Sequence, residues 1–525
     1  MRSPWKYLSP SISQLLFVVI FLQLALNIGN RLLDDGDTGY HIRAGEIILE
    51  TRSVPTQDPF SFRSPPLEWT AHEWLSEVVM ALVHRFSGLT GVVLFFIFLI
   101  SLTYAWLFRF VRSYGRNILS DLVIVLFVIV CSQIHFLARP HVFSLPLMIL
   151  WYYILDLYEY KEKNLLYGLP VLMLLWVNLH GGFIVGFALI GIYLIANICR
   201  YISSAKEHKP GFSRKITVLG ITLSACFLAS MANPQGYRIL LFPFKLTSNT
   251  YLMDHVIEFL SPNFHENMFF RYFLVFSFGL LILSKASLNI TEWALILLFF
   301  NMSLYSQRYI PLFGIFAAPV LSKQAGELLG SSGDWKIVHA IRRSAARVAS
   351  IDEGSRGYGW PVVAVSLALL FVGTGRIHFQ FDPKKKPVSA VEFLQREHLQ
   401  GNMFNNDEFG DYLIYSAYPR YKVFVDGRSD MYGSENFKEY FEVVSFAPSM
   451  ESILHKYDIN WIFFDSDSML SRYLVQHRDW RLIYSDSVAN IFIRDLPENR
   501  DLVGRYGGVV PYAEDSVKKK IVPGT

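Results

Sequence analysis

The chain has 525 residues, of which 52% are hydrophobic and only 18% are charged, and its mean hydropathy is +0.31. Soluble globular proteins are far less apolar, so the composition excludes a soluble enzyme and predicts an α-helical polytopic membrane protein. The formal net charge is +4 and the basic residues are scattered through short loops, which excludes a basic arm for nucleic acid.

A membrane-spanning helix needs about 20 apolar residues, and runs of this kind predict about eleven spans. They cover residues 12–29, 89–108, 118–136, 142–158, 166–178, 183–199, 216–232, 270–284, 290–305, 309–322 and 360–375. The first run follows Met1–Pro10 without a small-residue cleavage site, so we expect a retained anchor. The three cysteines share no metal-ligand or CxxC spacing, and we expect them to be core residues.

Lysine and arginine predict the orientation, because short cytoplasmic loops carry an excess of them. They recur on alternate sides of the successive spans, from Arg2 and Lys6 to the group between Lys323 and Arg347. The pattern predicts a cytoplasmic N-terminus and a polar cytoplasmic linker over residues 323–358. The alternative is one miscounted span, which would invert the second half of the chain.

The opposite face receives most of the unusual polar residues. It carries the connections 30–88, 135–141, 178–182, 233–271 and 306–309, together with everything after residue 376. Charged, irregular backbone at membrane depth is tolerated only where it lines a cavity or is buried in protein. The sequence therefore predicts a polar pocket on the outer face, at which aspartates, histidines and arginines from distant loops must meet.

The first outer loop begins with Asp35-Gly-Asp37, followed by His41. We expect Gly36 and Gly39 to let the backbone turn sharply, so that these side chains converge. The two carboxylates would provide a general base with an orienting partner, or half of a site for a divalent cation such as Mg²⁺ or Mn²⁺. Partial shielding from water raises the pKa of such a carboxyl, which suits a base near neutral pH. The alternative is that the acids end the first helix or face water.

The same loop contains two further helical candidates. Residues 42–51 form an amphipathic stretch, and His72 and Glu73 lie between Trp69 and Trp74. Such tryptophans suit an interfacial helix with its aromatic side in the lipid headgroups, which would present His72 and Glu73 to the pocket. The alternative is that the tryptophans are membrane-belt residues alone. No second histidine follows at the spacing of a zinc HExxH site.

The other outer connections carry further candidates for binding substrate: Arg139, His141, Asn178, His180, Glu258 and Arg308. The guanidinium fork matches phosphate oxygens, which makes Arg139 and Arg308 candidate phosphate clamps. The alternative for Arg139 is a side chain that snorkels to the membrane interface. Glu258 belongs to the loop 233–271, which would act as a lid, as a guide for lipid, or as a passive connection.

Residues 377–525 have ordinary charge density and no spanning run, which predicts a small α/β domain outside the membrane, after a transmembrane domain of residues 1–376. The predicted helices cover residues 389–399, 434–444, 450–457 and 469–477, and the predicted strands cover 421–425, 461–465 and 489–494. Asp426 and Arg428 would contact substrate or form a salt bridge in a surface turn, and we favour the salt bridge.

This plan resembles the GT-C class of membrane glycosyltransferases, which use polyprenyl-phosphate-linked sugars. The likeness rests on the acidic pair Asp35 and Asp37 directly after the first span, the interfacial helices of that loop, the polar outer turns and the C-terminal domain. Several short sequence motifs are similar to those of a bacterial subgroup of this class: DGDTGYHIRAGEIIL, QDPFSF, HEWLSE, ARPH, NLHGGF, NPQG, FGDYLIY and VFVDGR.

The resemblance implies transfer of a sugar from a polyprenyl-phosphate donor to a glycan, lipid or protein acceptor, on the periplasmic side of a bacterial inner membrane. Asp37 or Asp35 would deprotonate the acceptor hydroxyl, which then inverts the anomeric carbon, and Arg139 and Arg308 would stabilise the leaving lipid phosphate. Members that use lipid monophosphates mostly work without metal, whereas oligosaccharyl-transferring relatives need a divalent ion, and the Asp-Gly-Asp spacing fits both. The close sequence marks of the protein mannosyltransferases are missing.

Other classes of function compete with this interpretation. A transporter or flippase for lipid-linked glycans would carry ionisable residues through the midplane of several spans, often with an internal repeat. Here the polar residues gather on one face and no repeat is visible, which counts against transport. A non-catalytic scaffold with a glycan-binding outer domain would be indifferent to the loss of Asp37. A polymerase or ligase of surface polysaccharide is a neighbouring enzyme class.

Overall fold

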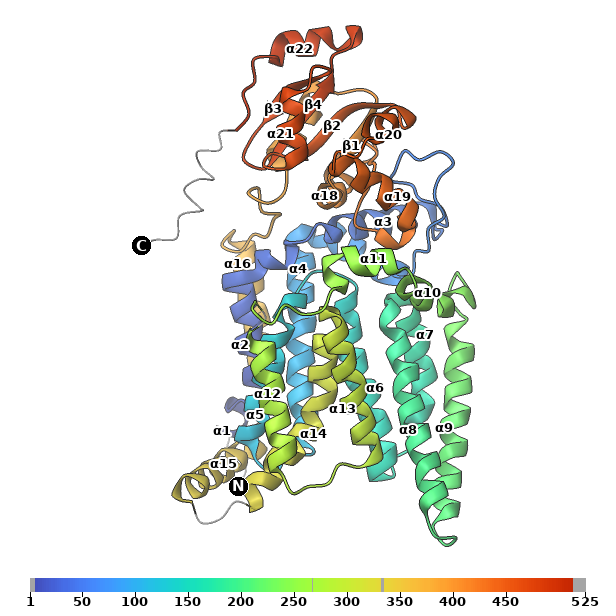
Figure 1. The fold of residues 1–525 in the computed structure, drawn as a ribbon. Coiled ribbons are helices and arrows are strands. Elements are labelled where there is room, and N and C mark those ends of the chain that lie inside the picture. Colours follow the sequence, from blue (N-terminus) through green and yellow to red (C-terminus); the bar gives the residue numbers. More distant parts are fainter. Residues whose placement is uncertain (1–4, 267, 332–334, 513–525) are drawn as a thin grey trace. The chain divides into compact units, whose positions relative to one another are not determined.

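The computed structural model describes residues 5–266, 268–331 and 335–512 (Figure 1). The chain forms two compact units. The helical unit comprises Met1–Arg31 and Thr90–His378, and the α/β unit comprises Leu32–Leu89 and Phe379–Thr525. The first outer loop is therefore grouped with the C-terminal segment and not with the spans that flank it in sequence.

The helical unit has a helix at every predicted span (Figure 1). These helices are α2 (Ile12–Gln23), continued by η1 (Leu24–Ile28) and η2 (Gly29–Leu33), α4 (Trp74–Arg112), α5 (Ile118–Ser132), α6 (His141–Lys161), α7 (Leu169–Leu179), α8 (Ile184–Ser203), α9 (Lys209–Ser230), α12 (Met268–Leu283), α13 (Ile290–Tyr305), α14 (Ile310–Ser331) and α16 (Gly359–Gly373). Within the described residues, six helices are long and apolar enough to cross a membrane, or up to seven if a bent pair counts as one span. The prediction of a polytopic helical membrane protein is confirmed.

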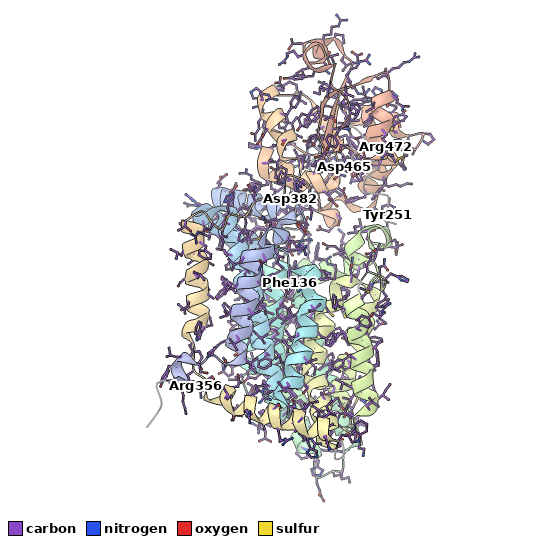
Figure 2. The ribbon with its side chains drawn as sticks, turned by 90° about the vertical axis from the view of Figure 1, so that its left-hand side faces the viewer. Phe136, Tyr251, Arg356, Asp382, Asp465 and Arg472 are labelled. Carbon is purple, nitrogen blue, oxygen red and sulfur yellow. The ribbon has the colours of Figure 1, made fainter. Side chains whose placement is uncertain are left out.

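Helix α14 forms the centre of the helical unit, and it is buried along nearly its whole apolar length. Gly314 lets α5 approach closely, because a Cβ there would lie 2.8 Å from Val128 Cγ1. On the α13 side, the rings of Phe299 and Phe316 stack with their centroids 4.1 Å apart. Phe136, which follows α5, is buried against Tyr104 of α4 with 5.6 Å between ring centroids (Figure 2).

Charged residues tie together helix ends that the sequence assigns to one side of the membrane. Arg112 at the end of α4 donates to Asp121 at the start of α5 (Nη1–Oδ2 2.9 Å), and Arg200 of α8 donates to Glu159 of α6 (Nη1–Oε1 2.5 Å). Lys323 of α14 donates to Glu292 of α13 (Nζ–Oε1 2.9 Å). These bonds support the predicted alternation of helix ends.

Further helices fill the predicted connections. The linker contains α15 (Lys336–Gly354), which meets α16 at a bend of 76°. The loop 233–271 contains α10 (Arg238–Thr247), α11 (Thr250–His255) and η6 (Ile257–Phe259), and the next outer turn forms η7 (Gln307–Tyr309). α4 is broken at Gly88, whose φ of 62° is outside the helical range, directly before the boundary between the two units.

The α/β unit contains a four-stranded sheet in the order β1-β2-β4-β3. β1 (Asn402–Asn405) is parallel to β2 (Ile459–Asp465), and β4 (Ala489–Arg494) is antiparallel to both β2 and β3 (Trp480–Ser485). Asp465, labelled in Figure 2, ends β2. The accompanying helices are α17 (Val388–Glu397), α18 (Asp407–Ala417), α19 (Ser429–Val444), α20 (Met450–Lys456), α21 (Met469–Gln476) and α22 (Arg500–Tyr506). The predicted strands at 461–465 and 489–494 are present, whereas β1, β3 and α18 were not predicted.

The predicted strand at 421–425 is wrong. In this segment only Val423 makes a β-bridge, to Ser61 of the first loop. The buried side-chain amide of Asn405 replaces the backbone hydrogen bonds that a neighbouring strand would make. Its Nδ2 donates to the Val425 carbonyl (2.8 Å), and its Oδ1 accepts from the Phe424 N–H (2.8 Å). Side-chain bonding of this kind satisfies the backbone without a continuous strand.

The predicted amphipathic helix of the first loop extends over Asp37–Thr51 as α3 and packs against α18. A Cβ at Gly36 would lie 2.8 Å from the Cβ of Asp411, and a Cβ at Gly39 would lie 2.8 Å from the Cβ of Tyr415. Gly36 lies in the bend between η2 and α3, as expected, whereas the sharp turn expected at Gly39 is wrong, because Gly39 lies inside α3. Their missing side chains instead allow two helices to approach closely.

Candidate functional site

The predicted site residues fall into both units. Asp35, Asp37, His41, His72 and Glu73 belong to the α/β unit. The remaining predicted residues belong to the helical unit: Arg139, His141, Asn178, His180, Glu258 and Arg308.

Asp37 is the first residue of α3, and its side chain is buried. Asp35 is half-buried, and its Oδ1 accepts a hydrogen bond from the backbone N–H of Asp37 at 3.1 Å. The two predicted acids therefore differ in position. Asp35 supports the first turn of α3, whereas Asp37 stands at the positive end of the helix dipole, which favours an ionised carboxylate.

A second buried acid, Asp411 of α18, meets Asp37 beside Gly427. A Cβ at Gly427 would lie 2.5 Å from Asp37 Oδ1 and 2.7 Å from Asp411 Oδ2, so both carboxylates converge on the bare side of this glycine. The Gly427 N–H donates to Asp411 Oδ1 at 2.9 Å. We call Asp37 and Asp411 the acid pair. It joins the first outer loop to the C-terminal segment.

The environment of the acid pair raises the pKa of Asp411 well above its usual range. Burial is the largest cause, followed by the charges of Asp37 and Asp426, and the hydrogen bond from Gly427 opposes them. Two acids held this closely resist double ionisation, because the second negative charge is repelled by the first. The pair therefore retains a proton at pH values where an isolated aspartate has lost it.

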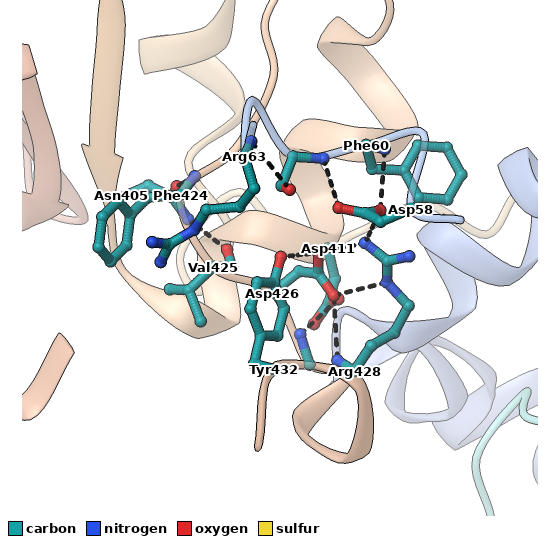
Figure 3. Close-up of polar contacts among 12 residues, drawn as sticks. Asp58, Phe60, Arg63, Asn405, Asp411, Phe424, Val425, Asp426, Arg428 and Tyr432 are labelled. Carbon is teal, nitrogen blue, oxygen red and sulfur yellow. Dashed lines mark hydrogen bonds and ion pairs between the residues drawn. The ribbon is translucent and has the colours of Figure 1, made fainter. Parts of the chain in front are cut away.

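A buried ionic network fixes the turn that carries Gly427 (Figure 3). Arg428 donates from Nε to Asp426 Oδ1 (2.8 Å) and from Nη2 to Asp426 Oδ2 (2.7 Å) and Asp58 Oδ1 (2.8 Å). Tyr432 donates its hydroxyl to Asp426 Oδ2 at 2.7 Å, and Asp58 accepts the N–H groups of Phe60 and Ser61.

The predicted surface position of this salt bridge is wrong, since Arg428 is only 2% exposed and Asp426 0%. Burial alone would raise the pKa of Asp58, but Arg428 and the hydrogen bonds to Asp58 lower it below the usual value. The network is therefore charged, and it clamps the first loop onto the segment before α19.

His41, His72 and Glu73 lie close together in the structure. His41 Nε2 lies 3.6 Å from Glu73 Oε2, and His72 Nε2 lies 3.6 Å from Glu73 Oε1. The other ring nitrogen of His41 lies 3.2 Å from Oε1 of the buried Glu77. His72 and Glu73 precede α4 and are not helical, so the helix expected around them begins only at Trp74.

In the helical unit, the two predicted phosphate clamps share one carboxylate. Arg139 donates from Nη1 to Glu258 Oε1 at 2.6 Å, and Arg308 Nε lies 3.6 Å from Glu258 Oε2. Burial would raise the pKa of Glu258, but the charges of Arg139 and Arg308 lower it well below the usual range. These three residues come from the turn before α6, from η6 and from η7, and we call them the arginine triad.

The other predicted residues of this unit brace outer turns. His141 donates from Nε2 to the His135 carbonyl (2.9 Å), and His180 Nδ1 accepts from the Gly182 N–H (2.9 Å) and contacts Ser144 Oγ (2.8 Å). Asn178 accepts from Asn233 Nδ2 at 3.1 Å, which joins the NLHGG and NPQG turns. The rings of His141 and His180 lie 6.4 Å apart, so these histidines are neighbours.

Within the described part of the chain, no group of three or more His, Cys, Asp or Glu side chains is arranged to hold a metal ion. The acid pair supplies two carboxylates, and Mg²⁺ is commonly held by one or two carboxylates together with waters and substrate phosphates.

Sequence reasoning missed Asp411, Gly427, Asp58 and Glu77 as site residues. Each lies inside a phrase that carried the GT-C resemblance: FGDYLIY, VFVDGR, QDPFSF and HEWLSE. The signal was therefore present as similarity, but no spacing rule connected these phrases to one another.

No protein-family model and no curated protein matches this sequence. Solved structures share its fold. The archaeal oligosaccharyltransferase AglB from Archaeoglobus fulgidus, in complex with an inhibitory peptide and a dolichol-phosphate, matches with a TM-score of 0.54 and 10% identity over 87% of this chain and 69% of that one. The apo oligosaccharyltransferase of the same organism matches with a TM-score of 0.53 and 10% identity over 93% and 75%.

ArnT from Cupriavidus metallidurans, bound to undecaprenyl phosphate, gives a TM-score of 0.48 and 13% identity over 90% of this chain and 97% of that one. At these identities the comparisons establish the fold. The fold expected from the resemblance is confirmed: the chain shares the fold of the two oligosaccharyltransferase structures.

Proposed function

We propose that the chain is an inverting membrane glycosyltransferase that moves a sugar from a polyprenyl-phosphate donor to a glycan, lipid or protein acceptor. The observation that carries the proposal is the acid pair, in which Asp37 and Asp411 converge on Gly427. A transferase of this kind must remove a proton from an acceptor hydroxyl, and two buried carboxylates that share a proton provide a base of suitable strength.

Within the pair, we assign the negative charge to Asp37 and the proton to Asp411. Asp37 begins a 15-residue helix, whose N-terminal end stabilises an anion by about 0.3–1 kcal/mol. Asp411 lies inside α18, is 2% exposed, and has a raised pKa because of its burial and the adjacent charges. The protonated Asp411 holds Asp37 in place without adding a second negative charge.

In the proposed reaction, Asp37 takes the proton of the acceptor hydroxyl as its oxygen attacks the anomeric carbon. A new bond forms between this oxygen and carbon, and the bond between the anomeric carbon and the phosphate oxygen breaks. The electron pair of the broken bond stays on the lipid phosphate. Because attack and departure occur on opposite sides of the carbon, the configuration inverts. Asp35 supports the backbone of Asp37, and His41, His72 and Glu73 bind substrate.

Arg139 and Arg308 are proposed to hold the leaving phosphate. Guanidinium groups form charge-assisted hydrogen bonds with phosphate oxygens, which stabilises the charge that the leaving group gains. The dolichol-phosphate in the AglB complex supports a lipid phosphate as the ligand of this fold. His141, Asn178 and His180 are proposed to shape the substrate site through the turns that they brace.

The proposed location is the outer face of a bacterial inner membrane, with the N-terminus in the cytoplasm and the C-terminal domain in the periplasm. Transfer there would contribute to the synthesis of a surface polysaccharide or to the modification of a lipid or protein. The positive charges at the opposite helix ends support this orientation.

The test is turnover by purified protein in detergent, with a panel of polyprenyl-phosphate sugars and acceptors. Asp37→Asn is expected to lose activity by about 10²–10⁴-fold, the usual contribution of a general base. Asp35→Asn is the matched control, because its amide oxygen still accepts the Asp37 N–H, and it should retain most activity. Unchanged turnover in Asp37→Asn would refute the base assignment. No turnover by the wild type with any donor would favour a transporter or a scaffold.

A further inference from the structure

The arginine triad contains an internal anion at the place where two arginines converge. Glu258 bridges Arg139 and Arg308 through different oxygens, at 2.6 Å and 3.6 Å. The triad remains partly open, with side-chain exposures of 16% for Arg139, 30% for Arg308 and 34% for Glu258. The guanidinium nitrogens are therefore accessible to a ligand phosphate without rearrangement of buried side chains.

The backbone around Glu258 is braced, so its carboxylate has a defined position. Ser306 donates its hydroxyl to the Glu258 carbonyl at 3.0 Å, and the Gln307 N–H donates to the Leu260 carbonyl at 3.0 Å. The Arg308 guanidinium lies 4.8 Å from the centre of the Phe259 ring. These contacts join η6 and η7 on both sides of the carboxylate. Glu258 is therefore built into the clamp.

The charge balance of the triad limits the ligand that it fits. Two guanidinium groups and one carboxylate leave a single net positive charge. A sugar linked through a lipid monophosphate is a phosphodiester with one negative charge, whereas a sugar linked through a lipid diphosphate carries two. The second charge of a diphosphate would lie close to Glu258 and would be repelled by it.

We propose that Glu258 determines the carrier class of the donor: it adapts the Arg139–Arg308 clamp to a lipid monophosphate and disfavours a lipid diphosphate. The inference rests on the proposed function, since it assumes that the clamp holds a lipid phosphate. Specificity for one carrier is the difference between the binding free energies of the two lipid phosphates. Glu258 would change this difference, because it repels the diphosphate more strongly than the monophosphate.

Binding of two lipids of fixed charge tests the proposal without any sugar transfer. The probes are undecaprenyl methyl phosphate, with one negative charge, and undecaprenyl methyl diphosphate, with two. Their dissociation constants are measured by native mass spectrometry in detergent. The wild type is expected to prefer the monophosphate. Glu258→Gln should increase the relative affinity for the diphosphate by about tenfold, because one repulsive charge is removed at short range.

Three further variants separate charge from structure. Glu258→Asp keeps the charge and should keep the preference for monophosphate. Glu266→Gln removes a charge from the same loop at a side chain that bonds Asn263, and it should leave the ratio of affinities unchanged. Arg308→Gln lowers the net charge of the triad and should strengthen the preference for monophosphate while weakening both affinities. Glu258→Gln and Arg308→Gln should shift the ratio of the diphosphate and monophosphate affinities in opposite directions. If one of these variants folds poorly, the other still tests the proposal.

An unchanged ratio in Glu258→Gln, or an equal loss of both affinities at normal thermal stability, would overturn the proposal. The outcome is separable from that of the proposed function. If Asp37→Asn abolishes transfer but the wild type binds both lipids equally, the glycosyltransferase stands and the role of Glu258 falls. If the wild type binds neither lipid, the role of Glu258 falls, and the turnover of the wild type and Asp37→Asn still decides the proposed function.

Discussion

Asp58 of the first outer loop and Arg428 of the C-terminal segment, 370 positions apart in the chain, form a buried ion pair with 2.8 Å between Oδ1 and Nη2. The pair is one of several contacts that join the first loop to the C-terminal segment within one compact unit, beside the packing of α3 on α18. It also fixes the turn containing Gly427, at which Asp37 and Asp411 meet. The geometry of the acid pair therefore depends on a clamp that makes no contact with the reacting atoms in the proposed mechanism.

Replacement of Arg428 by Leu should strongly destabilise the α/β unit. It would leave Asp58 and Asp426 buried without their cation, which typically costs about 3–5 kcal/mol. Thermal unfolding in detergent would measure the loss. Arg420→Gln is the matched control, because Arg420 is exposed and its replacement should change stability by no more than about 0.5 kcal/mol. Equal melting temperatures for Arg428→Leu and the control would contradict the assigned role of the clamp.

The raised pKa of Asp411 predicts a specific dependence of stability on pH. The folded state retains a proton that the unfolded chain releases near pH 4, so the folded protein binds more protons between that pH and the raised pKa. Stability should therefore fall as the pH rises through this window. Each unit by which the pKa is raised corresponds to about 1.4 kcal/mol.

Asp411→Asn should reduce this decline, which unfolding temperatures between pH 4.5 and 8.5 would show. Part of the slope should remain, because the pKa values of Glu77, Asp407 and Asp465 are also raised. Asp479→Asn changes an exposed acid and should leave the wild-type slope unchanged. If Asp411→Asn retained the wild-type slope, the shared proton would have to be assigned to other groups.

Gly427→Ala should reduce activity more than it reduces stability. The new methyl group would lie 2.5 Å from Asp37 Oδ1 and 2.7 Å from Asp411 Oδ2, so the two carboxylates must separate. A shift of this size at a catalytic pair can cost about 100-fold in turnover. Gly504→Ala provides the control, because a Cβ there meets nothing within 4 Å. Normal turnover in Gly427→Ala would show that the carboxylates need not converge.

Gly39→Ala should push α3 away from α18. Its Cβ would lie 2.8 Å from the Cβ of Tyr415 and 2.9 Å from the Asp411 carbonyl oxygen, and overpacking of this kind typically costs about 1–3 kcal/mol. The melting temperature of the variant measures the cost. A stability equal to that of Gly504→Ala would mean that the two helices can separate without penalty.

Part of the site was accessible from the sequence. Asp37 was singled out because an acid directly after a span is costly unless it has a function, and Arg139 and Arg308 because cations in tight outer turns need partners. The sequence did not indicate which side chain would be the partner of each of these three residues. The arginines share Glu258, and Asp37 meets Asp411 of α18, a helix that was not predicted.

The sequence by itself determined the helices of the membrane part, because long apolar runs can satisfy their backbone in lipid only as helices. It also predicted which helix ends share a side of the membrane, and the ion pairs Arg112–Asp121 and Arg200–Glu159 each join two helix ends that this prediction places on the same side. Only the tertiary structure decided which distant acids lie together and which cation each carboxylate has. Those relationships arise from close packing at Gly36, Gly39 and Gly427. Close packing depends on the shapes of the surfaces that meet and on the missing side chains of these glycines. Hydropathy and charge patterns along the chain do not contain this information.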